Sequence, residues 1–413
     1  MEILHARCAA LDVSKKDAKV CVRTPGKRAG TYTNTVTTWG ATTNQVLALR
    51  AYLLEQKVSL VVMEATGVYW KPYYFLLEDG LEVMLVNARQ ARNMPGRKTD
   101  VSDAQWLAEL GAHGLIRASF VPPAPIRQLR DLTRLRTTLT TERSREIQRL
   151  EKLLEDAGIK LSSVATDIMG VSGRAMLAAL IAGVTDPQAM AELAKARMRT
   201  KLPALAEALT GRFSEHHAFL ARLHLTQIDQ LSTAITELTH RIEVVIEPFR
   251  DALTLLVTIP GVSRLTADVI IAETGGDMSE FATAGHLASW AGTTPGHNES
   301  AGRSKSTRTR PGNPYLKQAL GIAAMAASRS NGTYLQAFFK RIAARRGYLK
   351  ALVATEHSML VAVWHMLSNG IVYTELGGGY FARLDPQKAI RQALRRLEQL
   401  GYTATLTPIE TTV

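Results

Sequence analysis

Four acidic residues of this 413-residue chain stand where carboxylates could meet. Asp12 follows an apolar run in ALDVS, and Glu64 ends another in VVMEATG. Asp100 and Asp103 lie three apart in KTDVSDAQWLAEL, so they share one face of a helical turn. Converging carboxylates repel one another unless a cation lies among them. Mg²⁺, with Mn²⁺ as the alternative ion, binds carboxylate oxygens and bridges to phosphate, which points to metal-assisted chemistry at a phosphodiester.

Each acid also has a purely structural explanation. Asp100 can be the N-cap of a helix with Asp103 three residues on, a variant of the capping box that is worth about 1 kcal/mol. Asp12 can be a turn residue before Ser14. Glu64 is harder to explain in this way, because a charged residue at the end of an apolar strand has no obvious partner. The conjunction of all four favours the metal hypothesis.

The elements that must position these acids form an α/β pattern. Short β-rich or apolar runs, separated by helical periodicity, predict the order β-β-β-α-β-α-β-α. This is the RNase H-like order, in which the first and fourth strands are neighbours and the helix after the last strand packs across their edge. We therefore expect an α/β RNase H-like domain over 1–122, with predicted strands in 8–24, 31–37, 59–64 and 82–86.

Composition narrows the partners. The formal net charge of +13 favours a polyanion, with nucleic acid as the leading candidate. Cys8 and Cys21 are the only cysteines, which excludes a disulfide framework and a zinc cluster and indicates a reducing, cytoplasmic location. No signal peptide and no membrane-spanning run is predicted, so we expect a cytoplasmic protein that has no membrane partner.

The middle of the chain is expected to be helical. The PPAP motif at 122–125 marks a boundary, and 123–250 is predicted to be a coiled-coil or helical segment with an insertion at 156–215. Within it, apolar residues step by three and four, which indicates a heptad seam. That seam can pack on the earlier helix or on a second chain, and a plain bundle helix remains an equal alternative. The seam residues are Ile228, Leu231, Ile235, Leu238, Ile242 and Val245.

A mainly α-helical C-terminal domain is expected over 251–370, followed by an extension over 371–413 with a small helix. The turn IPGVS, which contains Gly261, predicts a helix-hairpin-helix that offers backbone amides to a phosphate. From Ser300 to Thr355 there is not one Asp or Glu, and so one-sided a charge predicts phosphate contacts. The basic residues nearest the start of this run are Arg303, Lys305, Arg308, Arg310 and Lys317.

These motifs together resemble a known family, the DEDD transposases of the insertion sequence 110 type, which are related to the Piv invertases. The resemblance is carried by ALDVSKKDAKV, MEATGVYW, RKTDVSDAQWLAEL, IPGVSRLTADVIIAETG and ASWAGTTPGHNESAGRSKSTRTRPGNPYLKQAL, in this order. It covers about 5–120 and 225–350. It implies a RuvC-like catalytic domain, a coiled coil and a transposase domain. It also implies a bacterial, nucleoid-associated protein and Mg²⁺-dependent recombination of donor and target DNA that a structured bridge RNA guides.

Carried over residue by residue, the acidic tetrad falls on Asp12, Glu64, Asp100 and Asp103. The family's nucleophilic serine is the last residue of the segment TPGHNES and falls on Ser300, which implies a covalent phosphoserine intermediate. Arg97 and Lys98, just before the acids, are expected to contact nucleic acid. Since tetrad and serine belong to separate motif blocks, we expect a composite site within a homo-oligomer, a dimer that forms a tetramer in the synaptic complex.

Two alternatives remain open on the sequence alone. A RuvC-like metal-dependent nuclease or junction resolvase would use water as the nucleophile and would need the tetrad but not Ser300. A nucleic-acid-binding scaffold with a degenerate RNase H fold would be expected to lack at least one carboxylate, and all four are present. One departure from the family pattern is Ser263, which stands where glycine is usual after the IPGV of the turn.

Overall fold

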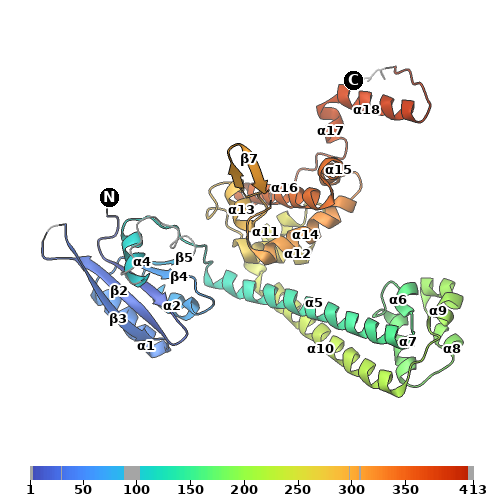
Figure 1. Ribbon diagram of the computed structural model, residues 1–413, viewed down its shortest axis with the longest axis horizontal. Helices are drawn as coiled ribbons and strands as arrows, with labels where there is room; N and C mark the ends of the chain where they lie inside the picture. The colour runs from blue at the N-terminus through green and yellow to red at the C-terminus, as the bar shows by residue number, and fades with distance from the viewer. Residues whose placement is uncertain (1–2, 29, 88–102, 297, 307, 408–413) are drawn as a thin grey trace. The chain divides into compact units, whose positions relative to one another are not determined.

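A computed structural model describes residues 3–28, 30–87, 103–296, 298–306 and 308–407. The chain divides into two compact units, Met1–Pro122 and Pro123–Val413, and each is described by itself (Figure 1). None of the helices in the described ranges is long and apolar enough to cross a membrane.

The N-terminal unit is built on a mixed five-stranded sheet with the strand order β3-β2-β1-β4-β5. Strands β1 to β3 form an antiparallel meander, whereas β4 and β5 join it in parallel to β1. The predicted strands are therefore present, and their order is compatible with an RNase H-like domain. The strands are β1 (Cys8–Val13), β2 (Asp17–Pro25), β3 (Tyr32–Gly40), β4 (Leu60–Glu64) and β5 (Val83–Val86).

Helices cover both faces of this sheet (Figure 1). On one face, α1 (Thr43–Glu55) and α2 (Trp70–Leu77) bury residues such as Leu49 and Tyr73 against the strands. On the other face, α4 (Asp103–Ala112) packs on Cys8, Ala10 and Val62. Because a strand points alternate side chains to opposite faces, every second residue of β1 and β4 turns toward α4.

Two long helices start the second unit. Helices α5 (Ala124–Asp156) and α10 (Glu215–Val245) pack along each other, and the ring of His224 pairs with the buried Glu146 at 2.6 Å between Nδ1 and Oε1. Ile228 and Ile242 of the predicted seam are buried, whereas the seam residues between them are partly exposed. The seam thus packs at least in part on α5 of the same chain, and a coiled coil stays a prediction.

Short helices fill the insertion between α5 and α10. Together with parts of α5 and α10 they enclose a core that includes Leu150 of α5, Met176 of α7 and Leu205 of α9. These helices are α6 (Leu161–Val164), α7 (Val171–Ile181), α8 (Pro187–Ala191), the 3₁₀ helix η1 (Ala196–Lys201) and α9 (Leu202–Ala208).

Within the residues that the structure describes, the rest of the second unit is helical apart from one small hairpin. Its buried centre includes α12, α14 and α16, and α16 donates a hydrogen bond from Trp364 Nε1 to the carbonyl of Phe281 at 2.8 Å. The elements are η2 (Glu247–Phe249), α11 (Arg250–Leu256), α12 (Arg264–Thr274), α13 (Ala284–Ala291), β6 (Asn298–Ser300), β7 (Arg303–Ser306), α14 (Pro314–Arg329), α15 (Tyr334–Arg346), α16 (Tyr348–Asn369), α17 (Tyr380–Leu384) and α18 (Pro386–Gln399).

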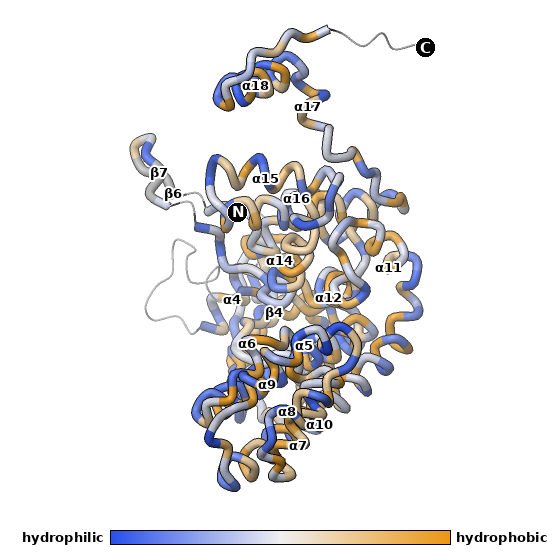
Figure 2. Tube along the Cα trace, turned by 90° about the vertical axis from the view of Figure 1, so that its right-hand side faces the viewer, coloured by the Kyte–Doolittle hydropathy of each residue, from blue (hydrophilic) through white to orange (hydrophobic). Residues whose placement is uncertain are grey.

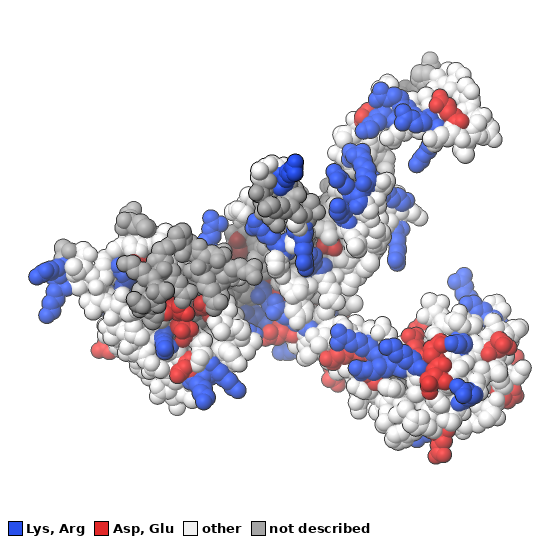
Figure 3. All heavy atoms as spheres, viewed as in Figure 1, with Lys and Arg blue, Asp and Glu red and all other residues white. Residues whose placement is uncertain are grey.

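The C-terminal extension contains α17 and α18, where one small helix was expected. Tyr334 and Phe338 of α15 stack on Phe381 of α17, which anchors the extension to the body of the unit. In Figure 2, α18 alternates between hydrophilic and hydrophobic residues. Figure 3 shows Lys and Arg side chains gathered over α15 and α18.

Candidate functional site

Asp12 and Glu64 lie side by side at the carboxyl ends of β1 and β4. The two strands are parallel, and their register pairs Leu11 with Met63, so that the next residues along the strands are Asp12 and Glu64. Alternation then turns both carboxylates toward the face that α4 covers. The predicted meeting of these two acids therefore has its structural basis in the register of one parallel strand pair.

Asp103 is the first residue of α4, and its charge affects the ionisation of Asp12. Burial raises the pKa of the Asp12 carboxyl, and the negative charge of Asp103 raises it further, whereas Lys19 lowers it. A carboxylate at the first turn of a helix is also favoured by the helix dipole. We call Asp12, Glu64 and Asp103 the acid face.

Helix α4 comes very close to the sheet because it carries a glycine at the contact. A Cβ on Gly111 would lie 2.6 Å from Cγ2 of Val62 and 3.2 Å from Sγ of Cys8. Leu107 and Ala108 pack on the same surface. This close packing sets the height of α4 over β1 and β4, and thereby the place of Asp103 at its start.

Three of the thirteen predicted site residues, Arg97, Lys98 and Asp100, lie outside the described residues. Within the described parts of the chain, no three His, Cys, Asp or Glu side chains are grouped so that they could hold a metal ion. The four-carboxylate metal site therefore stays a prediction. The sequence reasoning missed Lys19, which pairs with Asp12 across β1 and β2; the short polar turn SKKD between the strands is the signal that could have found it.

Ser300 lies beside the tip of the β6–β7 hairpin. Its backbone pairs with that of Arg303 across a two-residue turn. Both turn residues, Ala301 and Gly302, have positive φ angles, 52° and 73°, as tight two-residue hairpins of type I′ require. The segment 292–313, which carries this hairpin between α13 and α14, is called the serine loop below.

A cationic pocket of about 670 Å³ opens at the base of the serine loop. Arg308 and Arg310 line it and are exposed, as phosphate contacts would need. Lys317 lines it as well, but its ammonium donates to the carbonyl of Gly292 at 3.2 Å and to Oγ1 of Thr309 at 2.9 Å. Lys317 therefore holds the two ends of the loop together and also contributes positive charge to the pocket. Of the predicted basic residues, Arg303 and Lys305 belong to β7.

Gly261 lies in the turn between α11 and α12 and packs on α14. Its φ is +89°, and a Cβ there would lie 2.4 Å from the carbonyl oxygen of Ala323. This contact accounts for the glycine, and a phosphate contact by its amide stays a prediction. Ser263, where glycine was expected, is the N-cap of α12 and accepts from the amide of Thr266 at 3.2 Å. Helix α12 thus begins one residue after its cap.

Comparison with known proteins gives matches in both units. A transposase model of the DEDD type that is named for the insertion element IS110 matches residues 9–159. A second model, described as the transposase IS116/IS110/IS902 family, matches residues 253–340. The first contains the acid face, and the second contains the serine loop.

Two curated relatives belong to insertion elements. The uncharacterized 43.6 kDa protein of insertion element IS110 from Streptomyces coelicolor is 31% identical over 146 residues, which is 34% of this chain and 36% of that relative. This match thus spans about a third of the relative's length. The uncharacterized 42 kDa protein of insertion element IS900 from Mycobacterium paratuberculosis is 26% identical over 325 residues, 72% of this chain and 79% of that relative.

Proposed function

The chain belongs to the IS110 family of transposases, and on this premise we propose that it cuts and rejoins DNA strands at the ends of an insertion element. The observation that carries the proposal is the register of β1 and β4, which aligns Asp12 and Glu64 under the helix that begins with Asp103. Converging carboxylates at the ends of parallel strands are suited to a divalent cation and a phosphodiester.

The acid face offers carboxylate oxygens, the donors that Mg²⁺ and Mn²⁺ prefer, although its three acids do not by themselves form a group that could hold an ion. The pKa of Asp12 is raised by burial and by Asp103, so the ionised carboxylate is disfavoured there until a cation balances it. Asp12, Glu64, Asp103 and Asp100 would hold the ion. When bound, it would supply Lewis-acid polarisation of a phosphate oxygen. Lys19, beside Asp12, lowers the pKa of this carboxyl and so offsets part of the effect of burial and Asp103.

We infer that Ser300 is the nucleophile. Its Oγ forms a bond to the scissile phosphorus while the bond from phosphorus to the 3′ oxygen breaks. The serine hydroxyl loses one proton and the departing 3′ oxygen gains one, which leaves a 5′-phosphoserine and a free 3′-hydroxyl. Attack by the 3′-hydroxyl of another strand reverses the step and releases Ser300, so strands are exchanged without an external energy source.

The serine loop and the helices after it are suited to hold nucleic acid. Arg308 and Arg310 are exposed beside a pocket of about 670 Å³ at the base of the loop, and such side chains neutralise backbone phosphates. The second nucleic acid of the proposal is a structured guide RNA, which would give target choice to base pairing. The proposed assembly is a homo-oligomer, a dimer that pairs into a tetramer in the synaptic complex, in the bacterial cytoplasm.

A metal-dependent nuclease that uses water is the second candidate. The observation in its favour is that the acid face lies wholly within the N-terminal unit, whereas Ser300 belongs to the other. Such a nuclease would leave cut ends and no exchanged strands.

The test is strand exchange between two labelled DNA duplexes, one with the element's ends and one with its target, in the presence of Mg²⁺ and RNA transcribed from the element. We expect joined hybrid strands that vanish when the RNA is omitted or when Asp103 is changed to Asn. Glu109→Gln is the matched control, because Glu109 is an exposed acid on the same helix. Cut but unjoined DNA from the wild type would contradict recombination and favour the nuclease.

A further inference from the structure

The two ends of the serine loop cross each other at a pair of glycines. Gly292 has a φ of +76°, and a Cβ there would lie 2.8 Å from the carbonyl oxygen of Arg310. A Cβ on Gly312 would lie 2.3 Å from the carbonyl carbon of Ala291. Side chains are thus excluded from this crossing. We call Gly292 and Gly312 the neck of the serine loop, and the position of the loop depends on how the neck is held.

Asn313 follows the neck directly and uses both ends of its amide. Its Oδ1 accepts hydrogen bonds from the backbone amides of Tyr315 and Leu316, each at 3.1 Å, and so caps α14. Its Nδ2 donates to Oε2 of Glu273 at 2.6 Å. The capping bonds hold Asn313 on its own helix, whereas the bond to Glu273 ties the neck to another element, α12.

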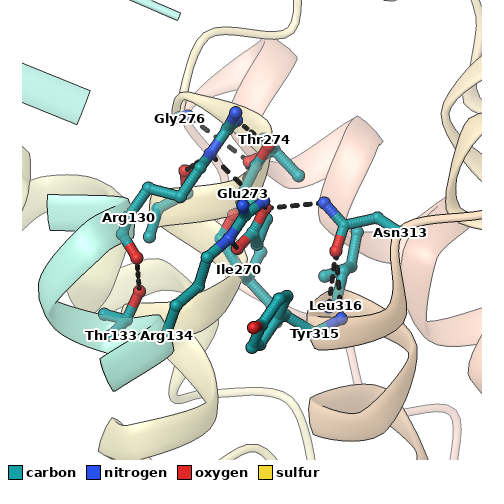
Figure 4. A network of polar contacts seen from close by, with 11 residues as sticks. Arg130, Thr133, Arg134, Ile270, Glu273, Thr274, Gly276, Asn313, Tyr315 and Leu316 are labelled. Carbon is teal, nitrogen blue, oxygen red and sulfur yellow. Dashed lines mark hydrogen bonds and ion pairs between the residues drawn. The ribbon is translucent and has the colours of Figure 1, made fainter. Parts of the chain in front are cut away.

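Glu273 is completely buried and is held by two arginines of α5 (Figure 4). Arg134 binds both carboxylate oxygens, with Nε to Oε1 at 2.7 Å and Nη2 to Oε2 at 2.8 Å. Arg130 lies 3.4 Å from Oε2 and also donates to the backbone carbonyls of Ala272 and Glu273. Charge-assisted bonds of this kind are short and geometrically demanding, so the carboxylate has one well-defined position.

A second buried pair joins the same helices. Arg136 of α5 donates to Oδ2 of Asp268 of α12 at 3.0 Å, and both side chains are buried. The early turns of α5 are therefore fixed to α12 at two places. The hydrogen bond from Asn313 to Glu273 extends this rigid junction to the neck of the serine loop.

We propose that Glu273 and Asn313 are positioning residues that hold the serine loop in register with α5. This inference rests on the proposed role of Ser300, and it adds that the loop is aimed by a buried carboxylate outside the acid face. The capping function of Asn313 can be carried by another short polar side chain. The hydrogen bond to Glu273 cannot be replaced in this way, because its donor must reach the carboxylate from the cap position.

The first test variant is Asn313→Ser, which keeps a capping oxygen and removes the donor to Glu273. Asn369→Ser is the matched control, because among the described residues the Asn369 amide donates within its own helix, to the carbonyl of His365. We expect the control to match the wild type. In Asn313→Ser we expect faster hydrogen exchange at the backbone amides of Thr293 and Gly296. We also expect strand cleavage at saturating DNA to slow by about tenfold or more, with the dissociation constant for DNA changed by less than about threefold.

The second test exchanges donor and acceptor. Asn313→Asp alone places two carboxylates against each other. We expect this variant to show faster hydrogen exchange at the backbone amides next to the neck. Adding Glu273→Gln restores one donor and one acceptor, and we expect the double variant to recover slow exchange and part of the cleavage rate. A general loss of folding would not be rescued by a second substitution in a buried network, so the rescue isolates the contact itself.

Two results would overturn the inference. One is a hydrogen-exchange rate at the neck of Asn313→Ser that equals that of the wild type. The other is a double variant whose hydrogen exchange and cleavage rate are no closer to the wild type than those of Asn313→Asp. The exchange readout needs neither DNA nor metal. If the wild type forms no phosphoserine while the exchange pattern follows our expectation, the proposed chemistry fails and the positioning of the loop stands.

Discussion

At the scale of single residues, Asp12 carries a charge that the folded protein disfavours. Burial and the nearby Asp103 raise the pKa of its carboxyl above the value in the unfolded chain. A group of this kind stabilises the fold below its unfolded pKa, and this stability is lost as the pH rises through the folded pKa. At neutral pH the ionised Asp12 therefore weakens the metal-free protein.

From this we predict that Asp12→Asn melts a few degrees higher than the wild type when metal is absent. The wild type should gain melting temperature on addition of Mn²⁺, and the variant should gain much less, because a ligand stabilises only the state that binds it. Calorimetry with and without Mn²⁺ measures both. Equal metal-induced shifts in the two proteins would remove Asp12 from the metal site.

Glu356 of α16 gives a prediction for pH. It is buried, Oε2 has no hydrogen-bond partner among the described residues, and burial raises the pKa of its carboxyl from 4.5 to about 7, although Lys317 lowers it. Stability should therefore fall by roughly 3 kcal/mol between pH 4.5 and 7 through this group. Glu356→Gln should flatten this part of the profile in urea titrations, whereas the exposed Glu398→Gln should not. A profile unchanged by Glu356→Gln would refute the assignment.

At this scale the sequence was informative about residue types and less so about partners. Asp12 and Glu64 were predictable because each ends an apolar run, and the structure aligns them. Lys19 was not singled out, since its role depends on which residue of β2 faces Asp12, and the register of a hairpin is set by its turn. The role of Asn313 depends on Glu273, 40 residues away, which local patterns do not reveal.

At the scale of elements, the approach of α4 to the sheet decides where Asp103 lies. The apolar runs predicted the strands, and the order of elements predicted the helix on the α4 face. The closeness of the contact was not predictable, because Gly111 in a helix reads simply as a weak helix former. Only the packing of Val62 and Cys8 against its backbone shows why a larger residue is excluded.

We therefore predict that Gly111→Ala destabilises the protein by about 1–3 kcal/mol through overpacking, in spite of alanine's higher helix propensity. Gly321→Ala is the matched control in the interior of α14, where a Cβ would lie 3.5 Å from Oε1 of Glu356, an ordinary contact. That variant should be neutral or more stable by up to about 1 kcal/mol. Chemical denaturation measures both, and a stabilised Gly111→Ala would contradict the close packing.

At the scale of the whole molecule, the two units have separate hydrophobic cores, and the division falls after Pro122. The PPAP motif predicts a boundary at this point, because prolines end regular secondary structure. The buried junction of α5 with α12 could not be predicted, since its partners, such as Arg134 and Glu273, lie 139 residues apart in the sequence. Long-range pairs of this kind leave no periodic signal.

Separate expression of residues 1–122 and 123–413 should give two folded fragments, each with one cooperative melting transition. We expect the larger fragment to keep salt-dependent DNA binding, because it contains the serine loop and its arginines, and to lack strand cleavage, because it lacks the acid face. Circular dichroism, melting curves and DNA titration at two salt concentrations check this. A larger fragment that cleaves DNA would contradict the role of the acid face.

Covalent capture of DNA by Ser300 can be tested with a denaturing gel of the protein incubated with labelled DNA, guide RNA and Mg²⁺. Wild type and Ser300→Ala are compared, with Ser304→Ala as the control in the same hairpin. We expect a protein-linked DNA band in the wild type and in the control, and we expect this band to be absent from Ser300→Ala. Free cleaved DNA in equal yield from all three proteins would show that water is the nucleophile and would contradict the role of Ser300.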